Sequence, residues 1–335
     1  MIKLRRIALI VAVVSLGYAC APSELRLAHP AAQDNGRVRG RRPVQSVTAD
    51  SRDGDARAPD SPILCSSCDE WNRPHEPFKI FGNTYYVGPA GLSSVLIATT
   101  NGLVVLDGGL PQSASVIDAN IRKLGFRTED VRLIASSHAH FDHAGGIAAL
   151  QRLSGARVVA SAQGAQAIAL GQPTEDDPQY RSGREPERRF APVTRVEIVR
   201  DGQALVVGDV TITAHLTPGH TSGSTTWTWR SCEAGRCLEV VYADSLNPVS
   251  DDGFRFRGDA THGSLVPAFR QSIQTVDRLP CDVIISVHPG FTGLDDKLAS
   301  RAKGVTPDPF IDANGCHAYA AGASQALAKR ITEEQ

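Results

Sequence analysis

The sequence predicts an α+β fold in which two mixed β-sheets pack face to face and helices cover both outer faces. The first observation is that short apolar segments of strand character are followed by helical segments twice along the chain. The second is that no change of composition separates the two rounds, which indicates one domain. The third is the balance of 41% hydrophobic and 21% charged residues, which is typical of a globular protein.

The N-terminal residues are predicted to lie outside this domain. Residues 1–21 have the features of a secretory signal peptide, since three basic residues precede an apolar stretch too short to cross a bilayer comfortably. Ala19-Cys20-Ala21 is a small-residue cleavage site, so we expect cleavage after Ala21 and export to the periplasm. Lipid attachment at Cys20 is an alternative, although Gly17 stands where a lipoprotein signal favours Leu. The other alternative is that residues 1–21 stay attached as an uncleaved membrane anchor.

A linker is predicted to follow the signal peptide. Residues 22–61 are dense in Arg, Asp, Ala and Pro and have almost no apolar periodicity. Such a segment cannot bury enough apolar surface to offset the entropy of ordering, so we expect it to be disordered. The folded domain is predicted to span residues 62–335.

The patterns within the domain give the order of its elements. Turn residues such as Gly82-Asn83 join alternating apolar segments into two hairpins, and Gly125 ends a helix that begins near Pro111. The first round is predicted to hold strands at 78–81, 84–87, 93–98, 103–107, 131–135 and 157–160, and helices at 111–124, from 146 and up to 170. The second round is predicted to hold strands at 196–199, 205–207, 210–215, 225–229, 238–242 and 283–287, a helix at 266–279 and two C-terminal helical segments.

A cluster of metal-ligand residues follows the predicted strand 131–135. His138, His140, Asp142 and His143 fall within six positions, and imidazole and carboxylate are ligands that zinc favours. His138 and His140 are two apart in an extended segment and therefore project to the same side. Asp142 and His143 come after the chain turns, so they can face a second point nearby.

Two further histidines complete the predicted site. His220 follows a Pro-Gly turn after one strand, and His288 precedes a Pro-Gly pair after another. Loops at strand ends, held by a rigid scaffold, are where binding residues concentrate. The set of five His and one Asp is enough for two zinc ions, each with an open coordination position.

These residues resemble the metallo-β-lactamase superfamily, and within it most the subclass B3 metallo-β-lactamases. The resemblance runs from about Phe78 to the C-terminus and includes, besides the histidine motifs, Asn83–Gly88, Thr221–Trp229, Tyr242–Leu246 and the segment 279–284. It implies an αββα sandwich. It also implies a secreted dinuclear zinc β-lactamase that opens penicillins, cephalosporins and carbapenems through a zinc-bound hydroxide and confers antibiotic resistance.

The resemblance also implies the role of each residue. One zinc ion is expected on His138, His140 and His220, and the other on Asp142, His143 and His288. Ser245 stands where subclass B1 enzymes have a Cys ligand, and subclass B3 enzymes combine this Ser with the histidine that corresponds to His288.

Catalytic and substrate-binding roles follow from the same resemblance. Asp142 is expected to orient the nucleophile as well as to bind metal, and Ser245 to hydrogen-bond the metal-bound water. Ser224 or Asn247 is expected to reach the substrate carboxylate. Asn247 departs from the Ser or Thr more usual at its position, so substrate affinity and preference are the properties that it would alter.

The cysteines fit an exported protein. Removal of the signal peptide leaves an even number of them, as expected for disulfides. Cys232 and Cys237 flank a strand turn and are expected to pair across it. The resemblance implies a disulfide between Cys281 and Cys316. The sequence does not decide the state of Cys65 and Cys68 in Cys65-Ser-Ser-Cys68. They could form a disulfide with each other or act as a redox pair. A zinc knuckle is the third alternative, although too few further ligands lie nearby.

Two other functions remain compatible with the sequence. One is a periplasmic hydrolase of the same superfamily that acts on a lactone or thioester, with Asp244 as a carboxylate bridging the metals. The other is a non-catalytic secreted zinc-binding scaffold. The net charge of −1 gives no reason to expect a nucleic-acid partner. We expect a monomer that acts on a small molecule and is not inserted in a membrane after signal cleavage.

Overall fold

The computed structural model describes residues 59–334, which belong to one compact unit. The predicted signal peptide and nearly all of the predicted linker therefore lie outside the described residues. Asp60 already forms an ion pair with Arg152, and Ile63 is buried. No helix among the described residues is both long and apolar enough to cross a membrane.

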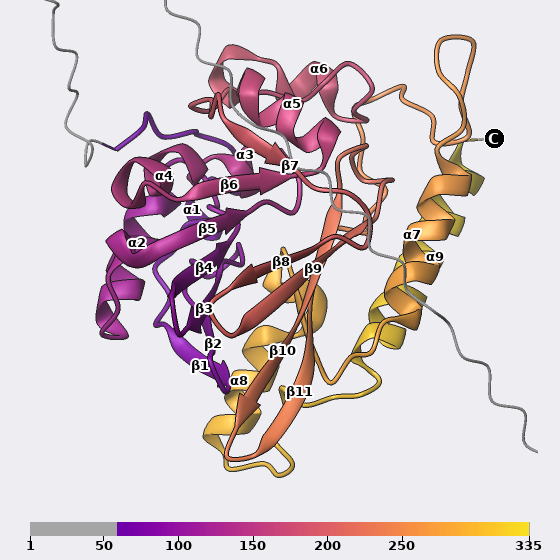
Figure 1. Ribbon diagram of the computed structural model, residues 1–335. Helices are drawn as coiled ribbons and strands as arrows, with labels where there is room; N and C mark the ends of the chain where they lie inside the picture. The colour runs from indigo at the N-terminus through magenta and orange to yellow at the C-terminus, as the bar shows by residue number, and fades with distance from the viewer. Residues whose placement is uncertain (1–58, 335) are drawn as a thin grey trace, which may run out of the picture. The chain divides into compact units, whose positions relative to one another are not determined.

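The strands of residues 59–334 form two sheets (Figure 1). The first has the order β1-β2-β3-β4-β5-β6-β7 and the second β12-β11-β10-β9-β8. The strands of the first sheet are β1 (Phe78–Phe81), β2 (Thr84–Tyr86), β3 (Val95–Thr99), β4 (Gly102–Leu106), β5 (Val131–Ala135), β6 (Arg157–Ala160) and β7 (Val196–Ile198). Those of the second are β8 (Ala204–Val207), β9 (Val210–Leu216), β10 (Thr225–Glu233), β11 (Arg236–Ala243) and β12 (Val283–Ser286).

Helices connect and cover these strands. The helices are α1 (Cys68–Trp71), α2 (Ser113–Lys123), α3 (Phe141–Ala144), α4 (Ile147–Ser154), α5 (Ala162–Leu170), α6 (Tyr180–Gly183), α7 (Val266–Arg278), α8 (Leu294–Ala302) and α9 (Gly315–Glu333). Three short 3-10 helices are η1 (Thr128–Asp130), η2 (Pro186–Arg188) and η3 (Pro289–Thr292). α7 and α9 lie side by side against the second sheet (Figure 1).

Both sheets are mixed, as predicted. The two expected hairpins form the antiparallel pairs β1–β2 and β3–β4, and from β4 to β7 the pairs are parallel. Parallel neighbours need long crossover connections, and α2, α4 and α5 lie in those connections. In the second sheet β8 to β11 pair antiparallel, and β12 is parallel to β11.

One strand belongs to a different sheet from the one that its place in the sequence suggested. Residues 196–199 were expected to open the second round, but β7 pairs in parallel with β6 of the first sheet. Since α5 packs against both β6 and β7, the connection is a β-helix-β crossover that returns the chain to the same sheet. The second sheet therefore begins at β8.

Three apolar cores separate four layers, which confirms the αββα architecture. Neighbouring residues of a strand point to opposite faces, so Leu133 of β5 packs between the sheets whereas Ile134 packs under the outer helices. In the second sheet Ile285 faces the interior between the sheets and Ile284 faces α7 and α9. Strands buried on both faces read as continuous apolar runs rather than as alternating ones.

The polar ends of buried aromatic residues join the two sheets. The indole Nε1 of Trp227 in β10 donates to the Ser136 carbonyl oxygen at 3.0 Å, directly after β5. The hydroxyl of Tyr242 in β11 donates to Asp107 Oδ2 at 2.9 Å, directly after β4. These bonds satisfy buried polar atoms and fix the strand ends of one sheet against those of the other.

Disulfides join the cysteine pairs in the described part of the chain. Cys232–Cys237 closes the β10–β11 hairpin, as predicted, and Cys281–Cys316 ties the segment before β12 to α9. The pairing of Cys65 and Cys68, which the sequence left open, is a disulfide at the start of α1.

Candidate metal centre

The first group of donors follows β5, where the chain leaves the first sheet. β5 is buried apart from one residue, and the segment after it carries His138 and His140 into the space above the sheet ends. The chain then turns into α3, which presents Asp142 and His143. The path of this segment depends on glycine, because a Cβ on Gly146 would lie 2.2 Å from the Gly108 carbonyl oxygen.

The second sheet supplies two more histidines at strand ends. His220 lies in the turn after β9, and His288 directly precedes η3 after β12. A Cβ on Gly219 would approach the Phe269 ring to 2.6 Å, so the turn before His220 packs tightly on α7. The six predicted donors thus form two groups, His138, His140 and His220, and Asp142, His143 and His288, with the ligand atoms of each group within 4.8 Å of one another.

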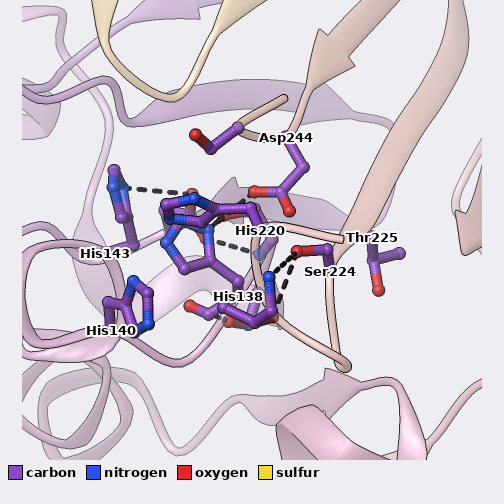
Figure 2. Close-up of polar contacts among 12 residues, drawn as sticks. His138, His140, His143, His220, Ser224, Thr225 and Asp244 are labelled. Atoms are coloured by element: carbon purple, nitrogen blue, oxygen red, sulfur yellow. Dashed lines mark hydrogen bonds and ion pairs between the residues drawn. The ribbon is translucent and has the colours of Figure 1, made fainter. Parts of the chain in front are cut away.

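In the first group each ring has one nitrogen held by an oxygen acceptor, which leaves the electron pair of the other nitrogen for a metal ion. His138 Nδ1 lies 2.7 Å from Asp244 Oδ1, and His220 Nδ1 lies 2.8 Å from the Asn247 carbonyl oxygen. His140 Nε2 lies 3.1 Å from both carboxylate oxygens of Asp177. Since these oxygens only accept, each engaged nitrogen carries the hydrogen and the other has a free electron pair. Figure 2 shows the rings of this group gathered together with that of His143.

An unpaired buried atom tests whether this group fits a metal ion. Within residues 59–334, His138 Nε2 is buried and has no hydrogen-bond partner. An unsatisfied polar atom in a protein interior is costly. A metal ion held by Nε2 of His138 and by the other two rings would satisfy it, and imidazole nitrogens suit zinc.

The second group forms a small triangle of donor atoms. Asp142 Oδ2 lies 3.3 Å from His143 Nε2 and 3.4 Å from His288 Nε2, and the two ring nitrogens are 3.3 Å apart. Two imidazoles and a carboxylate at these separations match the donor types of a zinc site. His288 Nδ1 lies 3.3 Å from the Gly91 carbonyl oxygen, which directs its Nε2 toward the group.

Burial and neighbouring charges set the protonation of the donors. Burial and the adjacent His138 and His140 rings lower the pKa of His220 to about 3, and burial lowers the pKa of His138 well below its usual range. Burial opposes ionisation of Asp142, but His143 and His288 hold its pKa well below its ordinary value. Against the effect of burial, the neighbouring carboxylates of Asp177 and Asp142 raise the pKa of His140 and of His143. Neutral imidazole and ionised carboxylate are the forms that bind metal, so metal binding at these two rings competes with protons.

Both groups line a cavity of about 510 Å³. His140, Asp142, His220 and His288 face it, as do residues from α1 and from the segments around α6 and η3. The Trp71 ring lies 5.3 Å from the His288 ring between centroids and forms one wall. A cavity of this size accommodates a small molecule beside the donors.

The three predicted residues outside the metal set have different positions. Ser245 and Asn247 line the cavity, and Ser245 is almost fully buried. Ser224 is 1% exposed, accepts a hydrogen bond from the Thr221 main-chain nitrogen at 3.1 Å and is absent from the cavity wall. Figure 2 shows Ser224 beside Thr225 at the start of β10. This position gives Ser224 a role in the turn that carries His220, and does not support the expected contact with substrate.

Sequence reasoning missed three residues of this site. Asp177 holds His140, Trp71 forms a wall, and Arg188 lines the cavity with its guanidinium 5.2 Å from the centroid of the Phe141 ring. Asp177 and Arg188 lie between α5 and β7, where no periodicity predicts an element. The length of that connection was the available signal, because long connections in compact domains are commonly functional.

Comparison with known proteins places this geometry in a family. The pattern of the metallo-beta-lactamase superfamily matches residues 87–232. The structure is similar to that of Rm3 metallo-beta-lactamase, at 48% sequence identity and a TM-score of 0.78, over 81% of this chain and 99% of that chain. It is also similar to MEM-A1, a subclass B3 metallo-beta-lactamase from a soil metagenome library, at 46% identity and a TM-score of 0.75, over 79% of this chain and 98% of that one. The chain belongs to the subclass B3 metallo-β-lactamases.

A more distant relative agrees with this assignment. BJP-1, a subclass B3 metallo-beta-lactamase of Bradyrhizobium japonicum, is 31% identical with a TM-score of 0.72, and the match covers 80% of this chain and 97% of that one. The match spans nearly the whole length of each of these three enzymes, so the metallo-β-lactamase fold extends through the described domain.

The position of Asp244 does not fit the alternative function, a lactone or thioester hydrolase in which Asp244 bridges the two metal ions. A bridging carboxylate would have to lie between the two donor groups. Asp244 is instead fully buried and bound to His138 Nδ1, on the opposite side of the ring from the free Nε2. In this metallo-β-lactamase Asp244 orients a ligand.

Proposed function

We propose that this enzyme binds two zinc ions and hydrolyses the β-lactam amide bond of penicillins, cephalosporins and carbapenems, and so confers antibiotic resistance. The observation that carries the proposal is the presence of two complete three-donor groups at one cavity in a subclass B3 chain. When bound there, zinc supplies Lewis acidity and makes water a nucleophile near neutral pH.

The side chains of the site have separate roles in orienting the attacking water and in forming the cavity. Asp142 is ionised and lies between His143 and His288, so its second oxygen is available to orient the attacking water. Ser245 lines the same cavity, and its hydroxyl is proposed to hydrogen-bond that water. Trp71 and Phe291 line the cavity beside the His288 ring and offer apolar surface to a substrate.

Arg188 is proposed to bind the substrate carboxylate together with Asn247. Both residues line the cavity, and Arg188 is half-buried with its guanidinium over the Phe141 ring. In the part of the chain that the structure describes, no carboxylate lies within ion-pair distance of this guanidinium. An incoming carboxylate would find a charged donor that is already positioned.

We further propose that the enzyme is exported to the periplasm as a monomer. The signal-like residues 1–21 favour export, and three disulfides in the described domain are typical of an oxidising compartment. Each donor group is complete within one chain, so neither metal site needs a second copy.

The decisive experiment is hydrolysis of a carbapenem and a penicillin by the purified mature protein. We expect loss of the ring absorbance, its arrest by a chelator and its return when zinc is added back. Metal analysis of the same sample should give two zinc ions per chain. Two bound zinc ions without hydrolysis of either substrate would refute the proposed activity and favour a non-catalytic zinc protein.

A further inference from the structure

The connection between α5 and β7 forms both a wall of the cavity and a contact to a metal donor. Its ends are closed by a hydrogen bond from the Phe190 main-chain nitrogen to the Gly171 carbonyl oxygen at 3.0 Å. We call residues 171–190 the cavity loop. Within it Gln179, Ser182 and Arg188 line the cavity, while Asp177 points to the His140 ring.

Asp177 is held firmly in this position. It is 6% exposed although it lies in a loop, whereas its neighbour Asp176 is exposed. Its Oδ1 accepts a hydrogen bond from the Gln179 main-chain nitrogen at 2.7 Å, and both oxygens lie 3.1 Å from His140 Nε2. A buried carboxylate needs such partners, because an unpaired buried charge is strongly unfavourable.

The contact decides which nitrogen of His140 can bind metal. A carboxylate accepts hydrogen bonds only, so His140 Nε2 carries the hydrogen and Nδ1 keeps its electron pair. His140 Nδ1 lies 3.5 Å from Gln179 Nε2, which also belongs to the cavity loop. Without Asp177 the ring is free to take the other tautomer, in which Nδ1 carries the hydrogen and cannot bind a metal ion.

We propose that Asp177 is a positioning residue that fixes the tautomer and orientation of His140 for the first zinc ion and thereby couples zinc binding to the order of the cavity loop. This inference rests on the proposed function, since it assumes zinc at His138, His140 and His220. Groups that accept a hydrogen bond from the second ring nitrogen of a metal-bound histidine typically contribute 10- to 100-fold to metal affinity.

The test compares the zinc affinities of the wild type, Asp177→Ala and Asp177→Asn by competition with a chromophoric chelator. We expect Asp177→Ala to weaken one of the two zinc ions by roughly 10- to 100-fold and to leave the other unchanged. Asp177→Asn should fall between, because an amide keeps one acceptor oxygen but also presents an NH₂ donor to His140. Asp176→Asn is the matched control, and its two zinc affinities should equal those of the wild type.

Two further readouts separate positioning from a general structural role. In cobalt-substituted protein, Asp177→Ala should change the visible absorption of one site, and Asp176→Asn should not. Amide hydrogen exchange in residues 171–190 should rise when zinc is removed from the wild type. In Asp177→Ala it should already be high with zinc present.

The outcomes distinguish this inference from the proposed function. Wild-type protein that fails to bind two zinc ions refutes the proposed function itself. Wild-type protein with two zinc ions and an Asp177→Ala variant with unchanged affinities refutes only the role of Asp177. Weakening of both zinc ions together with a lower unfolding temperature of the zinc-free variant would also refute it, because Asp177 would then support the fold rather than one ligand.

Discussion

The histidines of the first donor group are oriented by acceptors of different kinds. His138 and His140 donate to carboxylates, whereas His220 donates to the main-chain oxygen of Asn247. Because a main-chain oxygen is present whatever the side chain, residue 247 can differ from the usual Ser or Thr without loss of this contact. The departure at Asn247 therefore leaves this contact of the metal site intact.

Two glycines within two positions of ligand histidines should respond differently to the same substitution. Gly219→Ala would place a methyl group 2.6 Å from the Phe269 ring, whereas a Cβ on Gly290 meets nothing within 4 Å. We expect Gly219→Ala to shift His220 and weaken the first zinc ion at least tenfold, which corresponds to about 1.4 kcal/mol. Gly290→Ala should leave the affinity of both ions near the wild-type value. Equal zinc affinities for the two variants would contradict this reading of the turns.

The charge of Arg188 should act on substrate binding. We expect Arg188→Ala to raise the KM for an anionic penicillin roughly tenfold with little change in kcat, as for loss of a partly exposed charge-assisted hydrogen bond of about 1.4 kcal/mol. The matched control is Arg189→Ala, because Arg189 is exposed and donates to the Arg184 carbonyl oxygen outside the cavity. Steady-state kinetics at low and high salt would check this, and the effect should shrink at high salt. Identical KM values for the two variants would show that Arg188 does not bind the substrate.

The sequence predicted some residues of the site better than others, for physical reasons. The donors of both groups stand in short motifs whose residue types suit zinc, so they were found without a structure. Asp177 and Arg188 act from a connection without periodicity, and only the folded chain brings them to the donors. Ser224 was assigned to the substrate because a turn sequence does not show which way a hydroxyl points.

At the scale of elements, the local sequence pattern predicted where the strands lie more reliably than it predicted which strands pair with each other. The ranges 131–135 and 157–160 coincide with β5 and β6, because continuous apolar runs mark strands buried on both faces. The sheet to which β7 belongs was not predictable from its own residues. It depends on the crossover through α5, which is a property of the connection.

The disulfides should differ in their contribution to stability. Cys281–Cys316 spans 35 residues and joins the segment before β12 to α9, whereas Cys232–Cys237 spans 5 residues within one hairpin. In the chain-entropy model the first contributes about 4 kcal/mol to the free energy of unfolding and the second about 2 kcal/mol. Urea unfolding of the two double Cys→Ser variants would measure this difference. A larger loss for the hairpin pair would contradict the entropic account.

For the whole molecule, the prediction of two packed sheets followed from the two rounds of strands and helices, and the three cores confirm it. What the pattern could not give is how the sheet ends meet. That depends on contacts such as Trp227 to Ser136 between residues far apart in the sequence.

The export proposal has a direct test at this scale. Expression of the full-length chain in a Gram-negative host should give a periplasmic protein whose first residue is Pro22, as mass spectrometry of the intact protein would show. A mass that corresponds to diacylglycerol on Cys20 would instead identify a lipoprotein. A mass that includes Met1 would identify an uncleaved anchor.

Each donor group combines two side chains from the segment after β5 with one histidine from a loop of the second sheet. A metal ion on either group therefore joins the two sheets. Because binding of this kind stabilises only the folded chain, it compensates for substitutions that would unfold the metal-free protein. A substitution that destabilises the metal-free chain should therefore be tolerated better where the metal is abundant than where it is scarce. The supply of metal would in this way set how much sequence variation such a fold can accept.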